Sequence, residues 1–386
     1  MKLILKLIAG IIIGILLGLY APLPIARAMV TVKVLLGELI FFVVPLIILF
    51  FITSGIAALG KDSGKMVGVT TGLAYTSTII AGHLALLVAF IVIPFISAGG
   101  STEGTATEGL KSYMDFGVDP IFSVMTALIL AFILGIGIAK TGSSTLQRFF
   151  DEGKNIIELM IAKVIIPILP FYIAGIFVEV AHDGGVYQTL TTFGIVLLVA
   201  VLTHWVWLII LYSSVGAMTK QNPFKALKTM LPAYFTAIGT MSSAATIPVT
   251  LRQTKENKVS DKAADFVIPL CANIHLSGSI ITLVLASTAV MVIQNHAGLP
   301  SYLDMLSFIL LLGVVMIAAP GVPGGAVMAS LGILSSVLGF DEAALGLMIA
   351  LYTAQDSFGT ATNVTGDGAI AMLVDKWSGR SAKSND

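Results

Sequence analysis

The sequence predicts an all-α polytopic membrane protein with eight transmembrane helices and two re-entrant helical hairpins. Of the 386 residues, 57% are hydrophobic and only 11% are charged, whereas soluble domains carry about 25% charged residues. Eight apolar runs are long enough to cross a bilayer core, which needs about 20 residues. Two further runs are interrupted near their middles by Pro, Gly and Ser.

Charge and cysteine usage narrow the function classes. The chain has 21 basic and 21 acidic residues and a net charge of zero, so no basic excess suggests nucleic acid as a partner. The single cysteine, Cys271, excludes an internal disulfide and is expected to be an apolar packing residue. Membrane lipid is the expected surrounding of most of the surface.

The predicted spans follow from the lengths of the apolar runs. The N-terminal run is flanked by Lys2 and Lys6 like a secretory signal, but no cleavage site and soluble domain follow, so we expect a first membrane helix. The predicted spans are 3–22, 34–59, 67–98, 121–140, 156–181, 189–217, 263–294 and 342–374.

Lysine and arginine positions predict the orientation, because cytoplasmic loops are enriched in them. With a cytoplasmic N-terminus, only Arg27, Lys33 and Lys111 fall in outer loops. This charge distribution holds only if each broken run, 223–251 and 304–338, enters and leaves the membrane on the same side. We therefore predict that the first hairpin re-enters from the cytoplasm and the second from outside, with both termini cytoplasmic.

The last span carries a polar stripe. At about 100° per residue, Asp356, Thr360, Asn363 and Asp367 fall on one helix face. An ionisable group in a membrane helix costs about 2.5–3.5 kcal/mol on insertion scales, so such groups usually face a protein interior and serve a function. The stripe predicts a site for a cation and a substrate.

The turns of the two broken runs lie at 240–248 and 318–325. Non-helical backbone at membrane depth persists only where protein or a water-filled cavity satisfies its polar groups. Two discontinuous elements that enter from opposite faces suggest an inverted repeat. Such a repeat directs half-helix N-termini toward an anion and free carbonyls toward a cation.

Three motifs in these segments identify a resemblance. They are Ser-Ser-Ala-Ala-Thr-Ile-Pro at 242–248, Pro-Gly-Val-Pro-Gly at 320–324 and Asn-Val-Thr-Gly-Asp at 363–367. Together they resemble the dicarboxylate/amino acid:cation symporter family, the glutamate-transporter fold, over nearly the whole length of the chain. The resemblance implies a homotrimer in a plasma membrane, such as a bacterial inner membrane, that works by an elevator motion.

In that motion a transport domain slides past a fixed scaffold, and the second hairpin acts as a gate. The resemblance implies a scaffold at 1–62 and 119–185, and a transport domain at 63–100 and 186–376. It also implies a substrate site in which Asp356 pairs with an ammonium group. The implied substrate residues are Ser242, Ser243, Ala319, Gly321, Val322, Pro323, Gly324, Asp356, Gly359, Thr360 and Asn363.

One position departs from the family's acidic-substrate members. They carry an arginine that clamps the substrate's side-chain carboxylate, and this chain has Gly359 there, with Met241 offering no replacement in the first hairpin. A buried carboxylate without its bidentate partner is costly. We therefore predict a small neutral amino acid, such as serine, threonine or alanine, and Gly359 is expected to leave room for its side chain.

The resemblance also implies sodium coupling, with protons as the alternative. The implied cation residues are Cys271, Asn273, His275, Ser277, Asn363 and Asp367. The family's Asn-Met-Asp-Gly-Thr segment reads His275 to Ser279 here, and Ser277 cannot supply the aspartate's charge, so we expect one sodium site to be lost or weakened. A remaining sodium site at Asn363, Asp367 and unwound carbonyls near Cys271 and His275 is expected to persist, as is a site made of backbone carbonyls at 316–319.

Some assignments stay open. His275 either carries a proton or a charge in place of an ion, or is a neutral, hydrogen-bonded core residue. The polar residues at 75–78 serve either the buried sodium or helix packing, and His83 and His204 are expected to pack inside.

Two other function classes fit less well. Asp356 and Asp367, roughly 16 Å apart along one helix, cannot form a protease dyad, so we expect no enzyme. A channel would need a continuous polar lining. The prediction is a sodium-coupled symporter, with proton-coupled or acidic amino acid symport, and then a channel, as alternatives.

Overall fold

The computed structural model describes residues 2–58, 65–97, 109–293, 300–319, 321 and 323–382. Within these ranges the regular elements are all helical and no β-strand forms. Seven helical stretches of the described chain are long and apolar enough to cross a membrane. The last helix, α15 (Glu342–Ala382), is 41 residues long and is not among the seven, because its polar stripe lowers its hydropathy.

One group of helices comes from the first half of the chain. It comprises α1 (Lys2–Tyr20), α2 (Leu23–Ala58), α4 (Val124–Thr141), α5 (Ser144–Met160) and α6 (Ile166–His182), which pack against one another. A π-helical turn, Ile161–Ile165, joins α5 to α6. Helix α2 begins at Leu23, well before the predicted start at residue 34. Lys33, which was expected in an outer loop, is accommodated inside the helix because it forms a 2.7 Å ion pair with Glu179 of α6.

Small residues set the spacing between α1 and α6. A Cβ added at Gly14 would lie 2.3 Å from the backbone oxygen of Ala174, and one at Gly18 would lie 2.5 Å from that of Val178. Only glycine permits this approach, which is a common basis of helix packing in membranes.

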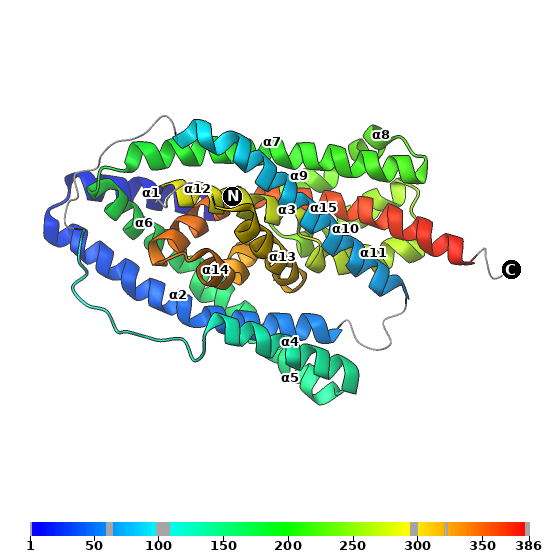
Figure 1. Cartoon of the computed structure of the whole chain (residues 1–386), viewed down its shortest axis with the longest axis horizontal. Helices are drawn as coiled ribbons and strands as arrows, with labels where there is room; N and C mark the ends of the chain where they lie inside the picture. The colour runs from blue at the N-terminus through cyan, green and yellow to red at the C-terminus, as the bar shows by residue number, and fades with distance from the viewer. Residues whose placement is uncertain are drawn as a thin grey trace.

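A second group surrounds α15. It comprises α3 (Lys65–Ser97), α7 (Val186–Thr219), α8 (Pro223–Thr229), α9 (Leu231–Thr240), α10 (Ser243–Glu256), α11 (Asp261–Ile274) and α12 (Ser277–Ile293). Helix α15 packs against α7, α9, α10, α11 and α12. In Figure 1, α7 runs along one long edge of the molecule and α2 along the other, with α15 between them.

Both predicted hairpins are present. The first consists of α9 and α10, joined where Met241 adopts a left-handed φ of 54° and Ser242 caps the start of α10. The second consists of α13 (Tyr302–Ala318) and α14 (Gly325–Leu338), and Gly324 at its tip has a φ of 74°. The second hairpin packs against α2 and α4 of the first helix group.

The predicted span 263–294 is not continuous. It is divided into α11 and α12 at His275, whose φ of −112° and ψ of 92° are extended rather than helical. The break leaves the C-terminal carbonyls of α11 and the N-terminal N–H groups of α12 without partners in their own helices. The chain thus has a third discontinuous element beside the two hairpins.

Candidate substrate and cation site

The polar stripe of α15 lies inside the protein. Asp356, Thr360, Asn363 and Asp367 are all buried, with at most 6% of each residue exposed, as the helical periodicity predicts. Their hydrogen-bonding partners come from other helices and from a hairpin tip. The partners of each residue indicate whether that residue can contact a substrate or a cation.

Asp356 holds the second hairpin. The N–H of Gly324 donates a 2.7 Å hydrogen bond to its Oδ2, and the hydroxyls of Tyr352 and Thr360 lie beside the carboxylate. The sequence did not single out Tyr352, which lies one helical turn before Asp356 and could have been found by that spacing. A buried carboxylate so placed can bind a cationic group, such as an ammonium, at the hairpin tip.

The two hairpin tips touch. The hydroxyl of Ser242 donates to the backbone oxygen of Gly321 over 3.0 Å, and Ser243 is buried beside it. Ala319 is buried as well, and Pro323 precedes the left-handed Gly324. Val322, another predicted substrate residue, lies outside the described residues.

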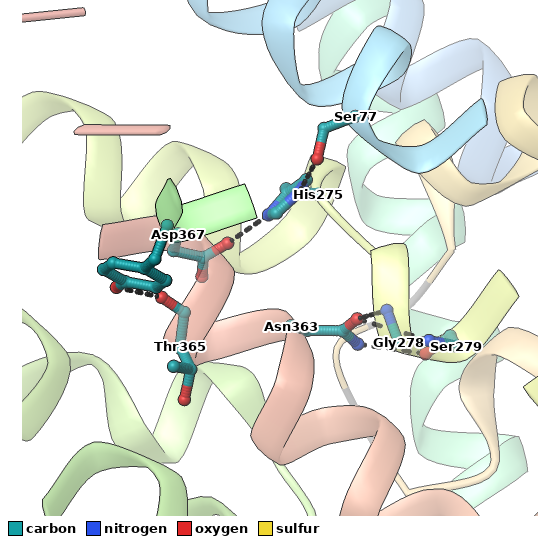
Figure 2. Close-up of polar contacts among 8 residues, drawn as sticks. Ser77, His275, Gly278, Ser279, Asn363, Thr365 and Asp367 are labelled. Carbon is teal, nitrogen blue, oxygen red and sulfur yellow. Dashed lines mark hydrogen bonds and ion pairs between the residues drawn. The ribbon is translucent and has the colours of Figure 1, made fainter. Parts of the chain in front are cut away.

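Asn363 caps the second half of the broken helix. Its Oδ1 accepts hydrogen bonds from the N–H groups of Gly278 (2.7 Å) and Ser279 (3.3 Å). Its Nδ2 donates to the hydroxyl of Ser279 over 3.0 Å, as Figure 2 shows. The starts of α12 and α14 therefore lie at the stripe, and the start of α10 contacts the tip of the second hairpin. Helix N-termini favour anions such as a carboxylate.

Gly359 lies at a close approach of α15 and α12. A Cβ added at Gly278 would be 2.3 Å from the oxygen of Gly359, and a Cβ added at Gly359 would be 3.5 Å from the hydroxyl of Thr282. A Cβ on Gly359 would thus point toward α12 and contact it at van der Waals distance. Glycine here serves helix packing, in addition to removing the charge that an arginine would bring.

His275 bridges two helices at the break. Its Nδ1 lies 2.9 Å from Oδ1 of Asp367 and its Nε2 lies 2.9 Å from the hydroxyl of Ser77 on α3 (Figure 2). The hydroxyl of Tyr212 donates to the backbone oxygen of Thr365 over 2.7 Å. Sequence reasoning named the 75–78 segment but missed Tyr212 and did not pair Ser77 with His275.

This serine–histidine–aspartate order is also that of hydrolases. In hydrolases the serine is accessible to substrate, and backbone N–H groups are positioned to stabilise an oxyanion. Ser77 and Asp367 are buried, His275 has no exposed surface, and Ser77 lies in the interior of α3. The cluster therefore cannot admit an acyl substrate.

The predicted cation residues fall into two places. Asp367 and His275 form one, where a nitrogen faces the carboxylate. Asn273 belongs to the other: its Oδ1 and the backbone oxygen of Ala272 each lie 3.6 Å from the Cβ position of Gly321. Within the described ranges, no three His, Cys, Asp or Glu side chains cluster.

Donor chemistry separates these two places. Sodium, as a hard cation, prefers oxygen ligands. The last carbonyls of α11 lie near the tip of the second hairpin, so they suit sodium, whereas the place beside Asp367 contains an imidazole. The backbone oxygen of Cys271 already accepts the N–H of His275 over 2.9 Å. The Ser277 hydroxyl is buried without a hydrogen-bond partner and is uncharged.

Comparisons with known proteins cover most of the chain. A sequence profile of the "Sodium:dicarboxylate symporter family" matches residues 3–377. Excitatory amino acid transporter 1 of Ambystoma tigrinum is 30% identical over 261 residues, which is 67% of this chain and 47% of that protein. The human protein of the same name is 29% identical over 274 residues, 70% of this chain and 49% of that protein.

Excitatory amino acid transporter 3 of mouse is 29% identical over 305 residues, 75% of this chain and 57% of that protein. The matched part therefore spans about half the length of these relatives. The matching profile, the two hairpins and the broken helix agree with one another. The chain belongs to the sodium:dicarboxylate symporter family, whose members are symporters rather than enzymes and have the glutamate-transporter fold.

Proposed function

We propose that this protein is a secondary active symporter that imports a small neutral amino acid together with sodium. The observation that supports this most directly is the contact of the buried Asp356 carboxylate with the N–H of Gly324, 2.7 Å away, at the tip of the second hairpin. An ammonium group bound to Asp356 would lie under that tip. Substrate binding would therefore be coupled to closure of the hairpin.

The other end of an amino acid would meet favourable charge. The N-termini of α12 and α14 lie at the stripe and suit the α-carboxylate. Ser242, Ser243 and Asn363 add hydroxyl and amide groups. Asn363 now binds the start of α12, so a substrate that used its amide would take over part of that cap.

The substrate's side chain is proposed to be neutral and small. Position 359 carries no arginine, and a Cβ at Gly359 would already be 3.5 Å from Thr282. An acidic side chain would be buried there without a bidentate partner, which costs several kcal/mol. The family's description names dicarboxylates, which favours an acidic substrate as the competing proposal.

Sodium is proposed to bind where two helices end. The C-termini of α11 and α13 lie near each other at the hairpin tip, and each presents carbonyls without intrahelical partners. Both ends also carry the negative pole of a helix dipole. Backbone ligands at 316–319 need no particular side chain, so this place could serve despite the changes at 275–279.

Transport is proposed to follow an elevator motion in a homotrimer. The helix groups around α2 and around α15 would be the scaffold and the transport domain, with the boundaries given above. Close contacts between small residues support a sliding surface: a Cβ at Gly55 of α2 would lie 3.3 Å from the Cβ of Ala318 in the second hairpin. The proposed location is a bacterial inner membrane with both termini in the cytoplasm.

The test is uptake by purified protein in liposomes, with sodium and proton gradients imposed separately. A panel should contain serine, threonine, alanine, glutamate, aspartate and succinate. We expect saturable uptake of a neutral amino acid driven by sodium, with protein-free liposomes as the control. Better uptake of aspartate would contradict the neutral substrate, proton-driven uptake would contradict sodium, and non-saturating flux would favour a channel.

A further inference from the structure

We propose that the imidazole of His275 takes the place of a cation at Asp367, so that Asp367 does not bind sodium in this protein. This inference deepens the proposed sodium coupling, on which it rests, by stating where the coupling ion does not bind. It also revises the prediction that His275 and Asp367 belong to a cation site.

The imidazole fills the space beside the carboxylate. Its two ring nitrogens each lie 2.9 Å from a partner, Asp367 on α15 and Ser77 on α3. His275 has no exposed surface and Asp367 is 1% exposed. Figure 2 shows the ring between the two partners. A cation bound to the same carboxylate oxygen would have to displace a fully packed side chain.

The backbone is shaped to hold the ring there. A Cβ added at Gly366, next to Asp367, would lie 2.8 Å from Cε1 of His275. Any other residue at this position would push the imidazole away. The extended backbone of His275 between α11 and α12 directs the side chain into this space. The backbone at both positions therefore fits the imidazole ring, so a cation could bind Asp367 only if the ring moved away.

Nearby oxygens do not make an alternative ligand set. The carbonyl of Cys271 accepts the backbone N–H of His275, and the hydroxyl of Ser77 is bonded to the imidazole. The hydroxyls of Ser277, Thr78 and Thr365 are buried without hydrogen-bond partners, but all three are neutral. A hard cation needs several oxygens and anionic compensation. Asp367, the one carboxylate here, is already bonded to His275.

The first test counts sodium ions. Equilibrium binding of radioactive sodium to the purified full-length protein gives the number bound per chain at saturation. Replacing His275 with asparagine (His275→Asn) shortens the side chain and leaves Asp367 available, so we expect one more sodium per chain than in the parent. The matched control is His83→Asn, since His83 bonds only to the backbone oxygen of Ile79 on its own helix, and its count should equal the parent's. No gain in His275→Asn would overturn the proposal.

A second variant guards against misfolding of the first. Asp367→Asn keeps an oxygen that accepts the Nδ1 hydrogen of His275, so the bridge to Ser77 is preserved while the charge is lost. We expect the same sodium count as in the parent. A loss of one sodium would show that Asp367 is a ligand and would overturn the proposal. A parent that binds no sodium at all contradicts the proposed coupling, but the differences between parent and variants still test the role of His275.

Discussion

The two hairpins share a shape but differ in what holds them. The second, α13–α14, is tied to α15 through Gly324 and Asp356 and packs against α2 and α4. The first, α9–α10, packs against α8, α11 and α15. In the described part of the chain it has no comparable packing against α2 or α4. Its tip meets the second hairpin through Ser242.

This difference indicates which of the two hairpins can move more easily. The second is fixed from two sides, by the carboxylate below its tip and by the neighbouring helix group beside it. The first is held by its own group and, at its tip, by the contact of Ser242 with the second hairpin. If the first hairpin faces the cytoplasm, as the charge distribution predicts, we expect it to move more easily than the second when the site opens toward the cytoplasm.

Removing the charge of Asp356 should have the largest effect. In Asp356→Asn, the amide oxygen can still accept from Gly324, so the second hairpin stays closed, but no anion remains for a substrate ammonium. Breaking a buried ion pair from one side costs about 3–5 kcal/mol, which corresponds to at least roughly 100-fold weaker binding at about 1.4 kcal/mol per tenfold. Calorimetric titration with the best amino acid of the panel measures this.

The control is Asp304→Asn, because Asp304 lies at the exposed start of α13 and belongs to the same hairpin. Its affinity should match the parent's. Unchanged binding by Asp356→Asn would remove the ammonium partner from the proposed site and leave Asp356 a structural anchor of the second hairpin.

Much of this arrangement could be predicted from residues close in sequence. Apolar run lengths predicted the spans, and the Pro, Gly and Ser residues near the middle of two runs, together with the positions of lysine and arginine, predicted the hairpins. The period of α15 predicted that Asp356 and Asp367 share a buried face. Such inferences succeed because they depend on local geometry and on the cost of exposing polar groups to lipid.

Partners far apart in the sequence could not be predicted in this way. The face of a helix does not say which helix will cover it, so Ser77 could not be paired with His275 across 198 positions. The unwound backbone near Cys271 and His275 was implied only by the family resemblance, because neither His275 nor Leu276 is a helix breaker. Gly359 was interpreted by the side chain it lacks, whereas its close approach to Gly278 depends on tertiary packing.

Disturbing the surface that fixes the second hairpin should have an intermediate effect. A Cβ at Gly332 of α14 would lie 2.2 Å from Cγ1 of Val124 and 2.9 Å from Cδ1 of Ile48. Overpacking of this kind costs about 1–3 kcal/mol, so Gly332→Leu should shift the hairpin away from α2 and α4 by roughly tenfold in population.

A disulfide reports on that packing. Gly55→Cys and Ala318→Cys, in a Cys271→Ser background, place two Cβ atoms 3.3 Å apart, close to the separation found in disulfides. Oxidative cross-linking should be about tenfold slower with Gly332→Leu. Gly239→Leu in the first hairpin is the matched control, because a Cβ there meets nothing within 4 Å. Equal cross-linking in the two leucine variants would mean that the contacts around Gly332 do not hold the second hairpin.

Breaking the contact between the two tips should have the smallest effect. Ser242→Ala removes a 3.0 Å hydrogen bond to the oxygen of Gly321 and the 3.3 Å cap of Ala245 at the start of α10. The cap stabilises α10 with or without substrate, whereas the lost hydrogen bond between the tips is worth about 1 kcal/mol, so amino acid binding should weaken about fivefold. The cross-linking rate between positions 55 and 318 should stay unchanged, since that contact belongs to the second hairpin only. Thr236→Ala, which removes a hydroxyl bonded within α9, should bind like the parent. If Ser242→Ala slowed cross-linking instead, the two tips would move together, and the expectation that the first hairpin moves more easily would be wrong.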